Sequence, residues 1–422
     1  MIRRLVQKQK RKFGNKKLRR NFYLLAGNEF FAELRLFYPV AVLAFEAVTG
    51  SFALAMSVFA VMGMAQALSE IPTGMLADKI GRRKVLILGS AAEFLGVLCY
   101  FLSFSSAHGL ALLYAGGVAF GFANAMFSGN NDAMLYETLS FYKRPHEISR
   151  LIGRVSSMGQ MALALSGILA TFCLWLGFSY RDLMMFSLVS VGIGVVLSLF
   201  TIEPPQHVTE DSHVGLHMLQ SLRLILKHPR LRWLAFASAI RTGLNQTANS
   251  FVPSFVETVW PRWLTPLYRT AQNGIGSLGF WFSGYITKRL GAPKALFSGT
   301  VFSTIVSLLA YTIASIMSPF LLIITQLSYA VTRTADSALQ QENFSNAQRA
   351  TMGSLISFAS AIVGGISSLL VGFLADSMGA ASSLTTLLLC SVPVSLIYFV
   401  LYQKDISSTR KTHEKLTNVT DG

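Results

Sequence analysis

The sequence predicts an all-α membrane protein with twelve transmembrane helices in two pseudo-symmetric halves of six helices each. Of its 422 residues, 52% are apolar and only 13% are charged. The apolar residues fall in runs of about 20, the length that crosses a bilayer. Lysines and arginines crowd the segments between alternate runs. Because basic loops stay on the cytoplasmic side, both termini are expected in the cytoplasm and the number of spans must be even.

The apolar runs define the domain organisation. We expect spans at residues 22–48, 51–77, 84–105, 109–141, 148–176, 182–202, 231–256, 265–288, 293–315, 318–344, 349–376 and 382–403. Hydropathy falls between the sixth and seventh spans, where a Leu-rich stripe predicts an amphipathic helix at the cytoplasmic surface. The predicted parts are a basic cytoplasmic arm (1–21), an N-terminal half (22–202), this linker (203–230), a C-terminal half (231–403) and a cytoplasmic tail (404–422).

The net charge of +16 is concentrated in the loops and in the first 20 residues, which hold ten basic residues and no acidic one. This distribution argues against nucleic acid as a partner and favours anionic lipid at the basic arm. The arm lacks the apolar centre of a signal peptide. The three cysteines lie far apart inside apolar runs, and no clustered metal ligands occur, so we expect no metal, no cofactor and no disulfide. The expected location is the cytoplasmic (inner) membrane of a bacterium.

A short charged turn joins the second and third spans. Residues 74–84 read Gly-Met-Leu-Ala-Asp-Lys-Ile-Gly-Arg-Arg-Lys. Gly74 and Gly81 permit close approach of helices, while Arg82 and Arg83 hold the turn in the cytoplasm. The pattern resembles the signature loop of the major facilitator superfamily, which joins the second and third of twelve spans. The resemblance implies that Asp78 and its arginines stabilise the state open to the outside.

Acidic residues near the cytoplasmic ends of the spans extend this interpretation. Glu70, Asp132 and Glu137 are placed where they could pair with Arg82, Arg83 or Arg154 and hold the cytoplasmic side shut. The predicted cytoplasmic gate therefore consists of Glu70, Gly74, Asp78, Gly81, Arg82, Arg83, Glu137 and Arg154.

Two further segments repeat the signature pattern. Residues 284–294, after the eighth span, repeat its glycines and basic residues, with Thr287 in place of Asp78. Residues 372–379 read Gly-Phe-Leu-Ala-Asp-Ser-Met-Gly and close the eleventh span on the opposite side. These positions predict a parallel repeat of the two halves and an inverted three-span repeat within each half.

Polar residues inside spans are costly, so their distribution indicates which spans are functional. They recur at helical spacing in spans one, four, seven and ten, whereas the interiors of spans six, nine and twelve hold no charge and span three holds only Glu93. In the family that the signature loop resembles, the first helix of each three-helix repeat lines a central cavity. The expected solute and proton cavity comprises Glu33, Arg35, Tyr38, Glu46, Asn124, Ser128, Asp132, Tyr136, Arg241, Asn245, Asn249, Arg333 and Asp336. The alternative for each residue is a purely structural role, in which its side chain forms a hydrogen bond with a neighbouring helix.

These residues favour a secondary transporter that works by alternating access. Glu33, Glu46 or Asp336 could exchange a proton for a cationic or amphipathic solute, which predicts proton-coupled efflux of drugs or metabolites. Two marks of proton-driven drug exporters in this family are missing, namely an arginine inside the fourth span and a Gly-Pro-x-x-Gly-Gly run in the fifth.

Two alternatives remain open. Arg35, Arg241 and Arg333 would suit an anionic solute, which favours a proton-coupled importer of a sugar, an organic acid or a peptide. A membrane sensor without transport is the third hypothesis. The sequence contains neither a Gly-x-Ser-x-Gly turn nor a phosphate-binding loop, so we do not expect an enzyme. We expect a monomer that binds a small-molecule solute, protons and membrane lipids.

Overall fold

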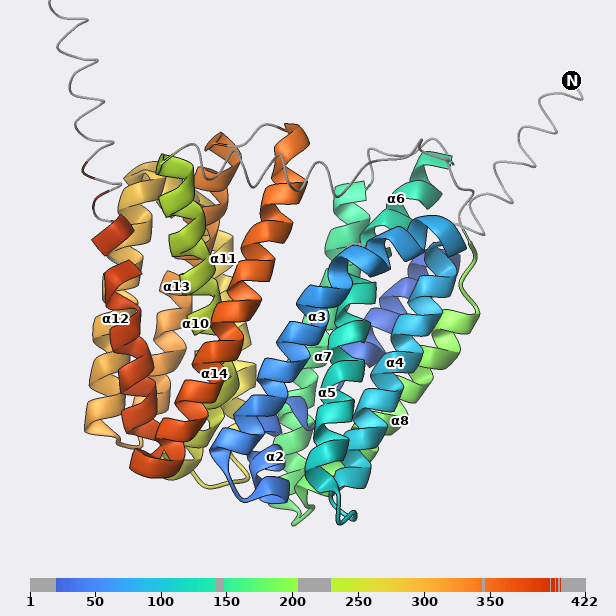
Figure 1. Cartoon of the computed structure of the whole chain (residues 1–422), viewed down its shortest axis with the longest axis horizontal. Coiled ribbons are helices and arrows are strands. Elements are labelled where there is room, and N and C mark those ends of the chain that lie inside the picture. The colour runs from blue at the N-terminus through green and yellow to red at the C-terminus, as the bar shows by residue number, and fades with distance from the viewer. Residues whose placement is uncertain are drawn as a thin grey trace, which may run out of the picture. The chain divides into compact units, whose positions relative to one another are not determined.

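The computed structural model describes residues 20–128, 130–141, 148–203, 229–343, 346–394, 396–398, 400 and 403. The regular elements within these residues are all helices (Figure 1). The chain divides into two compact units. The N-terminal unit extends to Asp211 and includes Pro261–Thr270, and the C-terminal unit contains the remainder from Ser212 onward. The predicted amphipathic helix of the linker, the basic arm and the tail fall outside the described residues.

The N-terminal unit is a bundle of long helices. It contains a helix over residues 20–33, η1 (Tyr38–Val40), α2 (Ala41–Thr49), α3 (Phe52–Ile80), α4 (Arg82–Ser103), α5 (Gly109–Phe127), α6 (Asn130–Phe141), α7 (Ile148–Trp175) and α8 (Tyr180–Leu199). The C-terminal unit contains α10 (Pro229–Val259), α11 (Thr265–Leu290) from Ala271 onward, α12 (Ala292–Ile313), α13 (Ser318–Asn343) and α14 (Asn346–Cys390).

Several helices have the properties of membrane spans. Seven helical segments in the described part of the chain are long and apolar enough to cross a bilayer: Phe52–Glu70, Arg82–Ser103, Gly109–Leu139, Leu151–Trp175, Tyr180–Leu199, Ala292–Ile313 and Leu355–Tyr398. The predicted class of helical membrane protein is thereby confirmed. The total of twelve spans stays a prediction.

The first and fourth predicted spans are interrupted, contrary to the expectation of continuous helices. In the first, the helix ends at Glu33 and residues 34–37 are non-helical before η1 begins. Pro39 lacks a backbone N–H and occurs at the start of η1, a position that proline favours over a helix interior. In the fourth, α5 ends at Phe127 and Ser128 adopts φ −57° and ψ 109°, so α6 begins a new helix at Asn130.

Three glycines share an unusual backbone conformation at the three related turns. Gly81 has φ 98° and ψ 153°, Gly291 has φ 81° and ψ 142°, and Gly379 has φ 82° and ψ 169°. Only glycine adopts this region readily, because a Cβ would clash with the backbone. The agreement supports the internal repeat predicted from the sequence. At Gly379 the turn is so tight that the predicted eleventh and twelfth spans follow one another within α14.

Glycines on α5 bring this helix unusually close to its neighbours. A Cβ on Gly117 would lie 3.2 Å from the carbonyl oxygen of Val58 on α3, and one on Gly121 would collide with the carbonyl of Met62. On the α4 side, a Cβ on Gly96 would lie 3.1 Å from the carbonyl of Gly116. Such backbone-to-backbone packing leaves little freedom for α3, α4 and α5 to move against one another.

Candidate functional site

Arg35 lies at the break in the first span and binds two carboxylates. Its Nη2 is 2.6 Å from Oε2 of Glu33, and its Nη1 is 2.9 Å from Oε1 of Glu93 on α4. The guanidinium carbon also lies 5.0 Å from the ring centre of Tyr38 and 4.8 Å from that of Phe120. Because residues 34–37 are not helical, the Arg35 side chain reaches both the carboxylates and the aromatic rings.

A third carboxylate extends the group. Glu29, one turn before Glu33, accepts a hydrogen bond of 3.3 Å from the Asn131 amide on α6. It also lies within electrostatic range of Arg35 and Glu33. Gly159 of α7 makes room here, since a Cβ on it would lie 3.2 Å from Glu29 and 3.5 Å from Glu33. We call Glu29, Glu33, Arg35 and Glu93 the Arg35 cluster, in which the guanidinium contacts Glu33 and Glu93, and Glu29 lies within electrostatic range.

The sequence predicted only half of this cluster. Glu33 and Arg35 were expected, whereas Glu29 and Glu93 were missed. Glu93 is 2% exposed and is the single charged residue inside the third predicted span. A single acid in an apolar span still needs a partner, and here the partner is Arg35 on the first predicted span.

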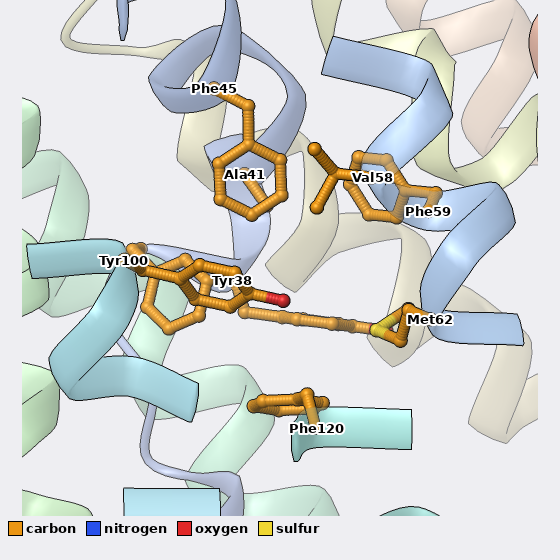
Figure 2. A pocket seen from close by; sticks show the side chains of 9 residues that line it. Tyr38, Ala41, Phe45, Val58, Phe59, Met62, Tyr100 and Phe120 are labelled. Carbon is orange, nitrogen blue, oxygen red and sulfur yellow. The ribbon is translucent and has the colours of Figure 1, made fainter. Parts of the chain in front are cut away.

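An apolar pocket adjoins Arg35 in the same unit (Figure 2). Its walls come from α2, α3, α4, α5 and the segment before α2. The lining residues are Phe37, Tyr38, Ala41, Phe45, Val58, Phe59, Met62, Tyr100 and Phe120. Tyr38, which was predicted to line the solute and proton cavity, lines this pocket, and its role toward a solute stays a prediction.

The remaining polar residues predicted in spans one and four do not form continuous stripes. Arg35 precedes the second helical segment of the first span, and Glu46 lies in the last turn of α2. In the fourth span, the break at Ser128 separates Asn124 on α5 from Asp132 and Tyr136 on α6. The predicted helical spacing fails because it assumed one uninterrupted helix in each span.

The C-terminal unit contains a second buried ion pair. Arg241 on α10 is 2.6 Å from Asp336 on α13, and the Ser238 hydroxyl donates a 2.8 Å hydrogen bond to the same carboxylate oxygen. Asp336 is 0% exposed and lies beside Tyr398. Among the described residues, the other Asp336 oxygen and Arg241 Nε have no hydrogen-bond partner. Two of the predicted cavity residues thus contact each other.

The other candidates of this unit are placed differently. Asn249 accepts a 3.0 Å hydrogen bond from the Gln272 amide on α11, and Asn245 is partly buried. Arg333 is exposed, although it is only three residues from Asp336. The structure therefore pairs Asp336 with Arg241 and leaves Arg333 on another face of α13.

The signature turn is held within the N-terminal unit by two carboxylates. Arg82 Nε lies 3.1 Å from Glu137, which confirms one of the predicted pairings. The carboxylate of Glu203 accepts hydrogen bonds of 2.8 Å and 2.9 Å from the backbone amides of Arg82 and Arg83, at the start of α4. Arg83 in turn donates to the carbonyl of Leu199 at 2.8 Å. The role of Glu203 was not predicted, because this residue is the first of the predicted linker.

The positions of the other predicted gate residues do not test their role. Glu70 and Gly74 lie within α3, which also contains the backbone of Asp78 in its last turn. The side chain of Asp78 falls outside the description. Arg154 lies exposed on α7. The function of these residues as a gate stays a prediction.

A bundle of membrane helices with ion pairs buried inside its spans is typical of a solute transporter. The sequence matches the Major Facilitator Superfamily over residues 25–368. The chain belongs to this superfamily, and the resemblance of its signature loop is confirmed. No curated protein sequence matches this chain.

Solved structures of other transporters share the fold. The nucleoside transporter NupG superposes with a TM-score of 0.75 at 14% identity, covering 91% of this chain and 99% of that one. A bacterial homologue of the human lysosomal transporter Spinster gives 0.71 at 15% identity, covering 92% and 96%. A POT family transporter in complex with 5-aminolevulinic acid gives 0.72 at 12% identity, covering 91% and 96%. At these identities the likeness is one of fold.

Proposed function

We propose that this transporter exports small amphipathic or cationic solutes in exchange for protons, by alternating access, and that the Arg35 cluster is the proton site. The observation that carries the proposal is the excess of acid in this cluster. One guanidinium contacts two carboxylates, and a third, Glu29, lies within electrostatic range, at a helix break in the N-terminal unit.

The charge balance explains why protons are the proposed coupling ion. Arg35 can neutralise one carboxylate fully, and its two short contacts divide that charge between Glu33 and Glu93. An unpaired carboxylate is strongly disfavoured in a membrane interior. The remaining acids are therefore neutralised by a proton or by a cationic group of the solute. Competition between these two ligands for the same oxygens is the basis of exchange.

The arginines favour a cationic over an anionic solute. Arg35 and Arg241 are each bound to carboxylates, which reduces their ability to attract an anion. Arg333 is exposed and is the main support for the alternative, a proton-coupled importer of a nutrient. The fold likeness to a nucleoside transporter and to peptide transporters also supports that alternative.

The proposed setting is the cytoplasmic membrane with both termini in the cytoplasm. The support is the basic composition of alternate loops and of the first 20 residues, which would also bind anionic lipid. We propose a monomer, because each half contributes its own buried ion pair.

The test is proton flux in inside-out vesicles that contain only the purified protein and an internal pH dye. With an acidic interior, adding tetraphenylphosphonium should raise the internal pH as the cation enters and protons leave. Glu93→Gln keeps the shape of the side chain and removes its charge, so it should abolish this flux. Asp182→Asn, in the capping box at the start of α8 and outside the cluster, should retain it. Normal flux with Glu93→Gln would refute the assignment of the proton site.

The same vesicles separate export from import. A dipeptide or a nucleoside that moved with protons would acidify the interior from an initially neutral state. If only a dipeptide or a nucleoside gave proton flux, the protein would be assigned as an importer and the exporter proposal would be wrong. Flux with the cation alone would support the exporter.

A further inference from the structure

Helix α6 contacts both the Arg35 cluster and the signature turn of the same unit. The side-chain amide of Asn131 donates a 3.3 Å hydrogen bond to Oε2 of Glu29 in the cluster. The amide of the preceding residue, Asn130, donates a 3.1 Å hydrogen bond to the backbone carbonyl of Arg82 in the turn. We propose that α6 couples these two places, and that Asn131 is the positioning residue that transmits the protonation state of Glu29 to the signature turn.

Asparagine suits this role because its amide is both a donor and an acceptor. An ionised carboxylate only accepts hydrogen bonds, whereas a protonated one also donates one. Asn131 Nδ2 already donates to Glu29, and Asn131 Oδ1 is a buried atom that has no hydrogen-bond partner among the described residues. A protonated Glu29 can donate to this oxygen, so that two hydrogen bonds replace one. The first helix is then joined more firmly to α6 when Glu29 carries a proton.

The charged side chains around Glu29 leave its interaction with Asn131 distinct from the ion pairs of the cluster. Those within electrostatic range are Glu33, Arg35, Glu93 and Asp132. Arg35, the cation of this set, contacts Glu33 and Glu93. The hydrogen bond of Glu29 is instead to the uncharged amide of Asn131. A change of charge at Glu29 therefore acts directly on Asn131.

The packing of α6 allows a change at Asn131 to reach the turn. The helix begins after the break at Ser128, so its first turn does not continue α5. Further along, α6 packs with the first helix, α4 and α7 in a hydrophobic cluster of Leu25, Ala26, Leu86, Met134, Leu135, Leu139 and Val155. The apolar face thus holds the helix in place while the first turn changes its hydrogen bonds. Because Asn130 and Asn131 are adjacent, a shift of one moves the other.

Arg82 is the residue of the turn that receives this shift. Its backbone carbonyl accepts from Asn130, its Nε donates to Glu137 farther along α6, and its backbone amide donates to Glu203. Two of these three partners belong to α6. Protonation of Glu29 therefore stabilises the described arrangement of the signature turn, and loss of the proton weakens it.

This inference rests on the proposed function, because the proton that it uses is the one exchanged at the Arg35 cluster. The response of the turn can nevertheless be measured without transport. The measurement is hydrogen–deuterium exchange, followed by mass spectrometry, of the full chain in lipid nanodiscs at acidic and neutral pH. An unstructured peptide corrects for the effect of pH on the chemical exchange rate.

The readout is the protection of the backbone amides at the start of α4. Acidification should raise this protection about two- to tenfold, which corresponds to the net contribution of one hydrogen bond. The amides at the start of α12 are the internal control, because they follow Gly291 at the related turn of the C-terminal unit. Their protection should change less than about twofold.

Three variants test the coupling. Glu29→Gln keeps a donor and an acceptor at every pH, so the turn should be protected at neutral pH and acidification should add little. Asn131→Leu has a similar size and lacks both groups, so protection should be low at both pH values. A merely structural asparagine would lower the protection without removing its pH dependence. Thr138→Val is the matched control on α6, because the Thr138 hydroxyl donates to the carbonyl of Met134 within the same helix. It should keep the wild-type response.

Three results would overturn the inference: no pH response of the wild-type turn, an equal response in Glu29→Gln, or an equal loss of response in Thr138→Val. If Asn131→Leu fails to fold, Glu29→Gln decides, because it retains both hydrogen bonds. The two proposals fail separately. A pH response without cation-driven proton flux would keep the coupling and remove the exporter. Intact flux with a pH response unchanged by Asn131→Leu would remove the coupling and keep the exchanger.

Discussion

Replacing Gly81 by alanine tests the physical account of the signature turn. The backbone of Gly81, at φ 98° and ψ 153°, costs a residue with a Cβ about 1–3 kcal/mol. The added Cβ would also lie 2.8 Å from Oε1 and 2.9 Å from Cδ of Glu203. The carboxylate must then move, although it accepts the amide hydrogens of Arg82 and Arg83. Loss of this cap at the start of α4 adds about 1–2 kcal/mol.

Related variants separate the two contributions. An ideal Cβ on Gly291 or Gly379 meets no described atom within 4 Å, so alanine there should produce the backbone strain alone. Glu203→Ala should remove the cap alone. Because Gly81→Ala already displaces the carboxylate, the double variant Gly81→Ala with Glu203→Ala should be less destabilised than the sum of its parts, by about 1–2 kcal/mol.

The assay is the thermal unfolding midpoint in detergent. An unfolding entropy of about 2.1 cal/mol/K per residue gives a shift of roughly 1 °C for each kcal/mol in a chain of 422 residues. Gly81→Ala should lower the midpoint by about 2–5 °C, and Gly291→Ala by about 1–3 °C. The reasoning is refuted if Gly291→Ala and Gly81→Ala are equally destabilised, or if Gly81→Ala and Glu203→Ala add fully.

Two further variants follow from the packing and the second ion pair. Gly121→Ala should reduce the yield of folded protein and lower its unfolding midpoint, because a Cβ collides with the carbonyl of Met62. Gly63→Ala is the control and should be neutral, since no described atom lies within 4 Å of its Cβ. Equal unfolding midpoints of the two variants would contradict this explanation. Asp336→Asn should destabilise by about 3 kcal/mol by leaving Arg241 buried without its anion, and changing Arg241 to Met as well should recover much of the loss in the same assay. Failure of that recovery would show that the pair stabilises the fold directly.

The fold was predictable because its main determinants are local in sequence. Apolar runs and basic loops define membrane helices without any knowledge of packing. The glycines of the three related turns were visible as well, and Gly81, Gly291 and Gly379 do adopt one conformation. The breaks were not predicted, although Pro39 and the Ser-Gly-Asn-Asn run at 128–131 are local signals that disfavour a continuous helix.

The candidate site was less predictable because it depends on which helix faces meet. Glu33 and Arg35 are neighbours in sequence, so their association was accessible. The pairing of Arg35 with Glu93 depends on which face of α4 meets the first span. A count of polar residues in each span gives no weight to a single acid. The role of Glu203 could not be predicted for the same reason. It depends on contact with the signature turn, which is distant in sequence, and not on the residues that flank Glu203.

The break in the first span has an electrical consequence. The helix over residues 20–33 is about 21 Å long and α2 with η1 about 20 Å, so neither crosses the roughly 30 Å hydrocarbon layer alone. We therefore expect the break in the first predicted span to place Arg35 near the middle of the bilayer, where a charge would have traversed about half of the transmembrane voltage. Each elementary charge that stops there gains or loses roughly 1.2 kcal/mol per 100 mV. The occupancy of this point by any ion consequently responds to voltage as well as to concentration.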